Sequence, residues 1–428
     1  MSVKSITSEA VRREHSSFAA VAAVTLLTGI GAGLGGMLLA LLLHGIQHLA
    51  YGYSATHVIS AESFLQGVSG AAPERRVLIL TLCGLVAGLG WWALYRFGRP
   101  LVSIRQAVKS DDPQLPLAST TIHALLQIVT VALGSPLGRE VAPREIGSAL
   151  AGWLSRRAGL SVAQSRIMVA CGAVFVLEVL LGTFGWAALV PAVVTSSVAA
   201  LVAQAGLGNE HQYLVPSMTL SASLVVWSVL CGPIFGAAAW CFTELMKRSR
   251  AAAPKGWRLP VLSLLNFAII GVLAMHFPQL PGNGKGPAGL AFDGGLTISL
   301  AASLLVLKVV ITASSLRAGA EGGLLTPGLA NGALLAIVLG GLWSLFWPGT
   351  SLGAFAVVGA TAFLAASMQM PITAVVLVFE FTRVSQDFLI PVLFAVGGAL
   401  LAFQACAKWV PALQPGLGFN WSGAGEAR

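Results

Sequence analysis

The chain has 428 residues, of which 56% are hydrophobic and only 10% are charged, whereas about a quarter of the residues are charged in soluble globular proteins. This composition excludes a soluble globular protein and indicates a polytopic helical membrane protein. The formal net charge of +9 is explained by cytosolic loops, so we expect no nucleic-acid partner. The 49 glycines favour close helix crossings within the bilayer.

The N-terminal region predicts a first membrane span that is not cleaved. An apolar run over about residues 18–43 is too long for the core of a signal peptide. Lys4, Arg12 and Arg13 precede this run, and positive residues beside a span favour the cytosolic side. We therefore expect residues 1–16 to form a cytosolic N-terminal tail on a multi-pass protein of the cell (inner) membrane.

Several of the apolar segments that follow are shorter than the roughly 20 residues a helix needs to cross a bilayer. Short and interrupted segments are typical of transporter folds with re-entrant half-helices. The sequence therefore predicts an all-α fold in which some helices enter the membrane without crossing it. The predicted spans lie near residues 17–45, 77–97, 119–136, 142–155, 162–184, 186–206, 218–245, 259–277, 296–316, 323–346, 351–366, 370–382 and 387–408.

Charges in the loops orient the two halves of the chain. Residues 207–217 contain no Lys or Arg, whereas residues 247–258 contain five. The positive-inside rule places the first loop outside and the second in the cytosol. We assign residues 17–206 to a first transmembrane repeat, residues 218–412 to a second, inverted repeat, and residues 413–428 to a C-terminal tail.

The segment GSPLGREVAPREIGSAL, residues 134–150, is the most informative stretch. It places Gly138, Arg139 and Glu140 at the start of a helix. A helix start offers four unpaired N–H groups and the positive end of the helix dipole, so it attracts anions. An irregular loop survives in a bilayer only inside protein or beside a wet cavity, and a carboxylate there indicates function. These residues predict an anion pathway that contains Glu140.

The chain also contains an internal repeat. The spacing of GREVAPREIG, residues 138–147, recurs in GGLLTPGLANG, residues 322–332, with five residues from the first glycine to the proline in both. An acidic helix follows each segment, marked by Glu178 in the first half and Glu380 in the second. Two halves with an extracellular join predict an inverted repeat that meets at the membrane midplane. The alternative is chance similarity between glycine-rich apolar helices.

Four segments resemble those of the chloride channel (CLC) family. Residues 138–147 resemble its GREGP-type segment, and EGGLLTP at residues 321–327 resembles its GGxFxP segment. PITAVVLVFEFT at residues 371–382 is similar to its PLTG-type helix, and residues 98–108 lie where its GSGIP segment belongs. The likeness runs over about residues 18–410, and the four segments in order are specific. The chain thus resembles a prokaryotic-type chloride channel or antiporter without a cytosolic regulatory domain.

The resemblance implies a homodimer in the lipid bilayer, in which each subunit has its own pathway for chloride or similar small anions. Chloride would bind between helix N-termini without a full positive charge nearby, weakly enough to leave again. Glu140 would be the gating glutamate, whose carboxylate competes with chloride and moves away when protonated. In an antiporter it would also carry the proton. The implied anion-binding residues are Gly138, Arg139, Glu140, Val141, Gly323, Leu324, Leu325 and Ser103.

The chain departs from the family at several pathway positions. Arg99 stands where the family has a central serine ligand, and Ser103 is the substitute we consider. The family's inner tyrosine is missing, because the last tyrosine of the chain is Tyr213. Val179 aligns with the proton-relay glutamate of family antiporters, although its neighbour Glu178 is a candidate inner acid. These departures favour passive anion flow, and a proton-coupled chloride or fluoride antiporter is the alternative.

The first repeat is shorter than the second. Fifty-eight residues separate Gly322 from Glu380, whereas only forty separate Gly138 from Glu178. The missing stretch lies near residues 172–175, where we expect two stunted helices or a distorted hairpin. This region builds the subunit interface in the family, so a transport-impaired remnant is a further alternative.

Other polar residues indicate neither an enzyme nor a metal site. Lys308 lies in an apolar segment, where it either snorkels, pairs with an acid or attracts anions to the pathway. His44 and His48 are four residues apart, and without a third ligand they favour an interfacial pair. The sequence has no HExxH or GxSxG motif, so we expect no enzyme. We expect no cofactor, only chloride as the transported ion.

Overall fold

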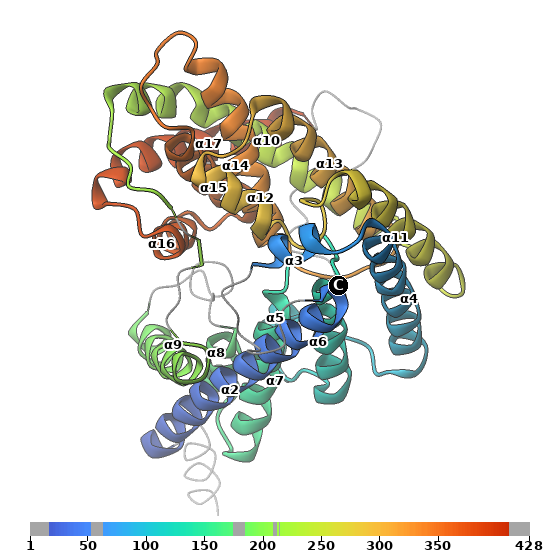
Figure 1. Cartoon of the computed structure of the whole chain (residues 1–428). Helices are drawn as coiled ribbons and strands as arrows, with labels where there is room; N and C mark the ends of the chain where they lie inside the picture. Colours follow the sequence, from blue (N-terminus) through green and yellow to red (C-terminus); the bar gives the residue numbers. More distant parts are fainter. Residues whose placement is uncertain (1–16, 53–62, 174–184, 209–211, 214, 411–428) are drawn as a thin grey trace, which may run out of the picture. The chain divides into compact units, whose positions relative to one another are not determined.

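The structure, a computed structural model, describes residues 17–52, 63–173, 185–208, 212–213 and 215–410. Within these ranges the chain is almost entirely helical (Figure 1). Eight of the described helical segments are long and apolar enough to cross a membrane: α2 (Phe18–Tyr51), α4 (Pro73–Phe97), α9 (Trp186–Leu207), α10 (Ala222–Ala251), α11 (Arg258–His276), α13 (Ile298–Arg317), α14 (Leu325–Trp343) and Gln386–Trp409, which joins η2 (Gln386–Phe388) to α17 (Leu389–Trp409). The shorter helices are α3 (Phe64–Gly70), α5 (Ile104–Lys109), α6 (Leu117–Ala132), α7 (Val141–Arg157), α8 (Val162–Gly172), α12 (Lys285–Asp293), α15 (Leu352–Met368) and α16 (Pro371–Thr382).

The first helix is longer than predicted. It continues past residue 45 to Tyr51 and ends at Gly52, whose φ of 78° is left-handed and whose N–H donates to the carbonyl oxygen of His48. The segment after residue 45 is polar in part but contains no helix breaker before this glycine, so the helix continues to it. Helix α8 ends at Gly172. Of the span predicted to end at 184, residues 174–184 lie outside the described residues, and so does half of the shortened stretch near residues 172–175.

The chain divides into two compact units, which are described separately. The first unit comprises Met1–Gln212, Arg248–Gly289 and Ser303–Ala330, and the second comprises Tyr213–Lys247, Leu290–Ala302 and Asn331–Arg428. The boundaries of the two sequence repeats remain a prediction.

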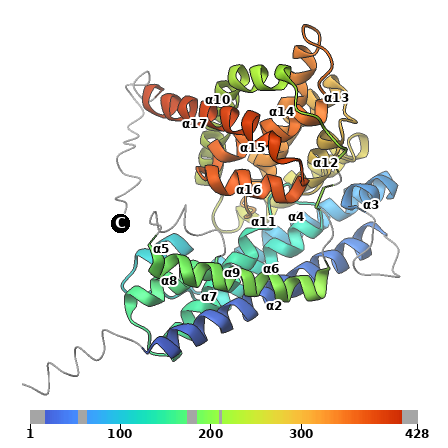
Figure 2. The same cartoon turned by 90° about the vertical axis from the view of Figure 1, so that its left-hand side faces the viewer.

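Glycines allow the helices of the first unit to approach each other closely. A Cβ at Gly33 of α2 would lie 2.8 Å from the carbonyl oxygen of Ala199 in α9, and one at Gly88 of α4 would lie 2.6 Å from Cα of Pro260 in α11. Helices α2, α7, α8 and α9 pack beside one another in this way (Figure 2). The small-residue contacts expected from the glycine content therefore occur, and they fix the helices that carry the loops described below.

The second unit is built around α15. Every residue of α15 from Gly353 to Ser367 is buried, as expected for a helix that is apolar on all sides. Trp227 of α10 packs on Phe355 with ring centroids 4.7 Å apart. The backbone of α10 also approaches that of α17, because a Cβ at Gly232 would lie 2.9 Å from the carbonyl oxygen of Ala395.

Candidate functional site

The loops that precede α7 and α14 lie directly against each other in the first unit. The N–H of Gly138 donates to the carbonyl oxygen of Gly323 at 2.7 Å, and the N–H of Gly323 donates to that of Gly138 at 2.9 Å. The two residues form an isolated antiparallel bridge. Because α7 begins at Val141 and α14 at Leu325, two helix starts leave from the same point. This is the arrangement expected of two half-helices that meet within the membrane.

The carboxylate of Glu140 occupies this meeting point. Its Oε1 accepts a hydrogen bond from the backbone N–H of Leu325, the first residue of α14, at 2.8 Å. The same carboxylate lies so close to Gly138 and Gly323 that a Cβ on either glycine would collide with it. The two glycines thus provide the space for the carboxylate, and the N-terminus of α14 provides its donor.

The second carboxylate oxygen of Glu140, unlike the first, accepts no hydrogen bond from the described residues. Oε2 of Glu140 is buried and has no hydrogen-bond partner among the described residues. A buried charge that is only half satisfied is costly, and within a membrane such a group indicates function. The first N–H groups of a helix bind anions readily, so the carboxylate lies where a small anion would bind. An anion can take this donor only when the carboxylate leaves it.

The neighbouring predicted residues belong to the same two loops. Arg139 is half-buried and interacts electrostatically with His44 of α2. Val141 is the first residue of α7, and Leu324 directly precedes α14, so their N–H groups belong to the two helix starts. Their role as donors to an anion remains a prediction.

Ser103, also predicted as an anion ligand, caps a helix. It precedes α5 and forms a capping box with Gln106: the serine Oγ accepts from the N–H of Gln106, and the Gln106 side chain accepts from the N–H of Ser103. The adjoining segment is held by Ser119 of α6, whose Oγ accepts from the N–H of Arg99 at 2.9 Å. Ser119 is buried, and no motif in the sequence marks it as part of this segment.

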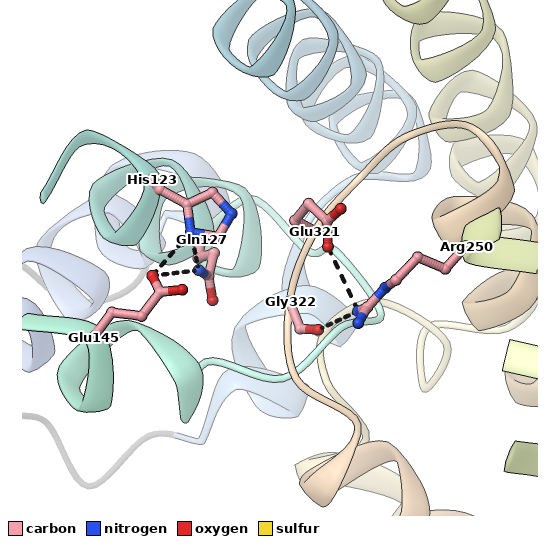
Figure 3. Close-up of polar contacts among 6 residues, drawn as sticks. All are labelled: His123, Gln127, Glu145, Arg250, Glu321 and Gly322. Carbon is pink, nitrogen blue, oxygen red and sulfur yellow. Dashed lines mark hydrogen bonds and ion pairs between the residues drawn. The ribbon is translucent and has the colours of Figure 1, made fainter. Parts of the chain in front are cut away.

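A polar cluster connects α6 to the helix that follows Glu140. Oε2 of Glu145 in α7 lies 2.8 Å from Nδ1 of His123 and accepts from Nε2 of Gln127 at 3.2 Å (Figure 3). His123 and Gln127 are both buried and lie one turn apart on α6. These contacts fix the orientation of the first two turns of α7, and therefore the direction from which Glu140 enters the site.

A second cluster holds the other loop. Nη2 of Arg250, in the last turn of α10, donates to the carbonyl oxygen of Gly322 at 3.0 Å and lies 3.5 Å from Oε2 of Glu321 (Figure 3). Gly322 directly precedes Gly323, which is paired with Gly138. An arginine from the predicted cytosolic segment is therefore connected to the loop that faces the Glu140 carboxylate.

Lys308 is fully inside the first unit. Its side chain is 1% exposed, so it does not snorkel. Its Nζ donates to the carbonyl oxygens of Leu280 and Gly282 at 3.1 Å and 2.6 Å. The N–H of Gly282 in turn donates to the carbonyl oxygen of Gly134, in the loop that leads to Gly138. The sequence did not show that backbone carbonyls solvate this lysine.

The structure does not test the inner-acid hypothesis for Glu178, and it places the histidine pair on one helix. Glu178, the candidate inner acid, lies outside the described residues together with Val179. His44 and His48 both lie on α2. Within the described part of the chain, no group of three or more His, Cys, Asp or Glu side chains is placed to hold a metal ion.

The sequence profile described as "Voltage gated chloride channel" matches residues 83–404. This match covers most of the chain. The chain belongs to the voltage-gated chloride channel family. This membership and the eight described helical segments long and apolar enough to cross a membrane make the chain a multi-pass membrane protein. Among its relatives, a ClcB-like protein of Ralstonia nicotianae is 30% identical over 75% of this chain and 80% of the relative. The voltage-gated ClC-type chloride channel ClcB of Salmonella typhimurium is 26% identical over 75% of this chain and 82% of the relative.

Solved structures agree with this assignment at the level of the fold. A slow cyanobacterial Cl⁻/H⁺ antiporter is similar with a TM-score of 0.74 at 17% identity, covering 89% of this chain and 94% of the antiporter. A CLC-type fluoride/proton antiporter is similar with a TM-score of 0.62 at 18% identity, covering 90% and 96%. The CLC-like helical fold predicted from the sequence is confirmed.

Proposed function

We propose that the protein transports chloride or a similar small anion across the membrane, and that Glu140 gates the pathway in each subunit. The observation that carries this proposal is the hydrogen bond between Oε1 of Glu140 and the N–H of Leu325. A negatively charged side chain occupies a donor that suits an anion. The carboxylate of Glu140 and a transported anion therefore cannot both bind the N–H of Leu325 at the same time.

Proton binding releases the gate in this mechanism. A neutral carboxyl group is a weaker acceptor for the N–H of Leu325 than a carboxylate, so protonation favours departure of the side chain and entry of the anion. The contacts of the bound anion would be backbone N–H groups of the two helix starts. Such binding is weak enough to allow the anion to leave again, which conduction requires.

Proton-coupled exchange is a second candidate function. Oε2 of Glu140 favours it, because this oxygen has no hydrogen-bond partner among the described residues. It can therefore take up a proton while Oε1 still accepts from the N–H of Leu325. In that case the carboxyl group carries a proton across the same point that the anion passes. Simultaneous measurement of proton and chloride movement in liposomes distinguishes the two: a coupled exchanger moves protons uphill under a chloride gradient, and a passive pathway does not.

The membrane setting is part of the proposal. We infer that the chain forms a homodimer in the cell inner membrane, with its N-terminus in the cytosol. The basic segment at residues 247–258 supports this orientation. A lysine-directed label that does not cross the membrane tests it, because Lys255 is exposed and should react only from the cytosolic side.

Chloride efflux from liposomes tests the gate. We expect the wild-type protein to release chloride faster as the pH falls, because protonation opens the site. Glu140→Gln cannot ionise, so its efflux should no longer depend on pH. Glu74→Gln is the matched control, because Glu74 is exposed in the first turn of α4. Unchanged pH dependence in Glu140→Gln would contradict the proposed gate, and no efflux from the wild type would indicate the transport-impaired remnant.

A further inference from the structure

The peptide unit between Gly322 and Gly323 is held at both ends. Its carbonyl oxygen, on Gly322, accepts from Nη2 of Arg250 at 3.0 Å, and its N–H, on Gly323, donates to Gly138 at 2.9 Å. This peptide lies two peptide units before the Leu324–Leu325 peptide, whose N–H donates to the Glu140 carboxylate, and the peptide between them is also held, because its carbonyl oxygen, on Gly323, accepts from the N–H of Gly138 at 2.7 Å. The orientation of the first peptide therefore limits the direction of the second.

Glycine makes this restraint necessary. Gly322 and Gly323 have no Cβ, so their backbone has more accessible conformations than any other pair of residues. Side chains are not tolerated there, because a Cβ at Gly322 would lie 2.6 Å from Cβ of Leu137, and one at Gly323 would collide with Glu140. The loop therefore needs a restraint from outside, and a charged donor provides a stronger hydrogen bond than a neutral one.

The guanidinium of Arg250 is itself oriented. Oε2 of Glu321 lies 3.5 Å from the same Nη2 that donates to Gly322 (Figure 3). Glu321 precedes Gly322 in the chain, so the arginine binds two consecutive residues of the loop. The Arg250 side chain is 47% exposed, which means that the ion pair by itself stabilises the fold little. The bond to the Gly322 carbonyl, beside the site, is the contact with a consequence for transport.

We propose that Arg250 is a positioning residue for anion recognition, which acts through the Gly322 carbonyl to aim the N–H of Leu325 at the pathway. The inference rests on the proposed function of Glu140. Beyond that function, we propose that Arg250, at the predicted cytosolic end of α10, affects the selectivity of the site among small anions. Arg250 does not contact the anion in this proposal; Glu321 keeps its guanidinium in place.

The test compares anion preference in liposomes, as the ratio of nitrate flux to chloride flux. Arg250→Gln loses the charged donor, so we expect this ratio to change on the order of fivefold, the scale of one charge-assisted hydrogen bond at a partly exposed site. Arg250→Lys keeps the charge but not the forked geometry and should change the ratio less. Arg258→Gln is the charge-matched control: Arg258 is exposed in the same segment and stacks on Trp257.

A double substitution checks the route of the effect. If Arg250 acts through the donor that Glu140 occupies, Arg250→Gln and Glu140→Gln should be non-additive in the flux ratio.

If Arg250→Gln changes only the melting temperature, or changes the ratio no more than Arg258→Gln, the inference is wrong while the Glu140 gate stands. If Arg250→Gln does not fold, Glu321→Gln must give a smaller change of the same sign, and its absence overturns the inference. A wild type without flux overturns both proposals.

Discussion

Two ionisable side chains of the first unit, Glu140 and Lys308, are held in opposite ways. Lys308 is 1% exposed and donates to two backbone carbonyls, which belong to the connection between α11 and α12. Oε1 of Glu140 accepts from the backbone N–H of Leu325, its second oxygen has no hydrogen-bond partner among the described residues, and Arg139 and Arg144 interact with the carboxylate electrostatically. The lysine donates to two fixed backbone groups of the protein, whereas one oxygen of the carboxylate is buried without a hydrogen bond.

In the proposed mechanism this difference separates a structural charge, Lys308, from a movable one, Glu140. Removing Lys308 from its place would leave two buried carbonyls and a cation without partners, which is strongly unfavourable. Moving Glu140 breaks its hydrogen bond to Leu325, weakens its electrostatic interactions with Arg139 and Arg144, and frees the N–H of Leu325 for another acceptor. In the proposed mechanism a gate changes position at low cost, and we expect the carboxylate rather than the lysine to do so.

The largest effect is expected from the glycine beside the carboxylate. Gly323→Ala introduces a Cβ that collides with Glu140, so the carboxylate must leave the N–H of Leu325. A hydrogen bond to a charged acceptor contributes about 1.5–3 kcal/mol, so occupancy of this position should fall on the order of tenfold or more. Chloride efflux should then lose its pH dependence, as in Glu140→Gln.

Gly45→Ala is the control for that change. Gly45 lies in α2, and a Cβ there would meet nothing within 4 Å, so efflux and its pH dependence should stay as in the wild type. A Gly323→Ala protein that folds and keeps the wild-type pH dependence would show that the carboxylate does not need this position.

Lys308→Met tests whether Lys308 has a structural role. The methionine cannot donate to Leu280 or Gly282, and each unpaired carbonyl costs about 1–3 kcal/mol, partly offset because a buried charge is removed. We expect a net loss of about 2 kcal/mol in unfolding free energy, measured by thermal unfolding in detergent. Lys308→Gln, which can still donate, should lose less, and the exposed Lys255→Met should lose nothing.

The ratio of nitrate to chloride flux completes this test. In a structural role for Lys308, Lys308→Gln keeps the wild-type ratio. A changed ratio in a variant of wild-type stability would show that the lysine attracts anions to the pathway, which was one of the sequence hypotheses.

The smallest effect is expected for Ser103→Ala. Loss of the cap of α5 should reduce the unfolding free energy by about 1 kcal/mol. Ser161→Ala removes an equivalent capping box, with Gln164, at the start of α8 and is the matched control. If Ser103 only caps its helix, both variants keep the wild-type chloride affinity in flux assays; a loss of affinity in Ser103→Ala alone would place this hydroxyl in the pathway.

The centre of the site was predictable from the sequence because its chemistry depends on local pattern. Glycines before a helix start, a carboxylate among them and a second copy of the spacing predicted two helix starts near Glu140, and the structure places Gly138 against Gly323. The capping box at Ser103 was also readable, as a serine followed three residues later by Gln106. This signal favours a capping role for Ser103 over the predicted role as an anion ligand.

The supporting contacts were not predictable because they join residues that are far apart in the chain. Arg250 and Gly322 are 72 positions apart, and Glu145 reaches His123 across 22. No periodicity or spacing specifies such pairs; they depend on how α6, α7 and α10 end near the two loops. Lys308 shows the same limit, since its partners are backbone carbonyls, which every residue type provides equally.

The central claim is that an anion and the Glu140 carboxylate compete for the N–H of Leu325. Crystals of the wild type and of Glu140→Ala, soaked in bromide at neutral pH, test it through the anomalous signal of bromide. We predict a bromide ion beside the N–H of Leu325 in Glu140→Ala and the carboxylate there in the wild type. Bromide at that N–H in the wild type with the carboxylate unmoved, or no bromide there in Glu140→Ala, would contradict the account.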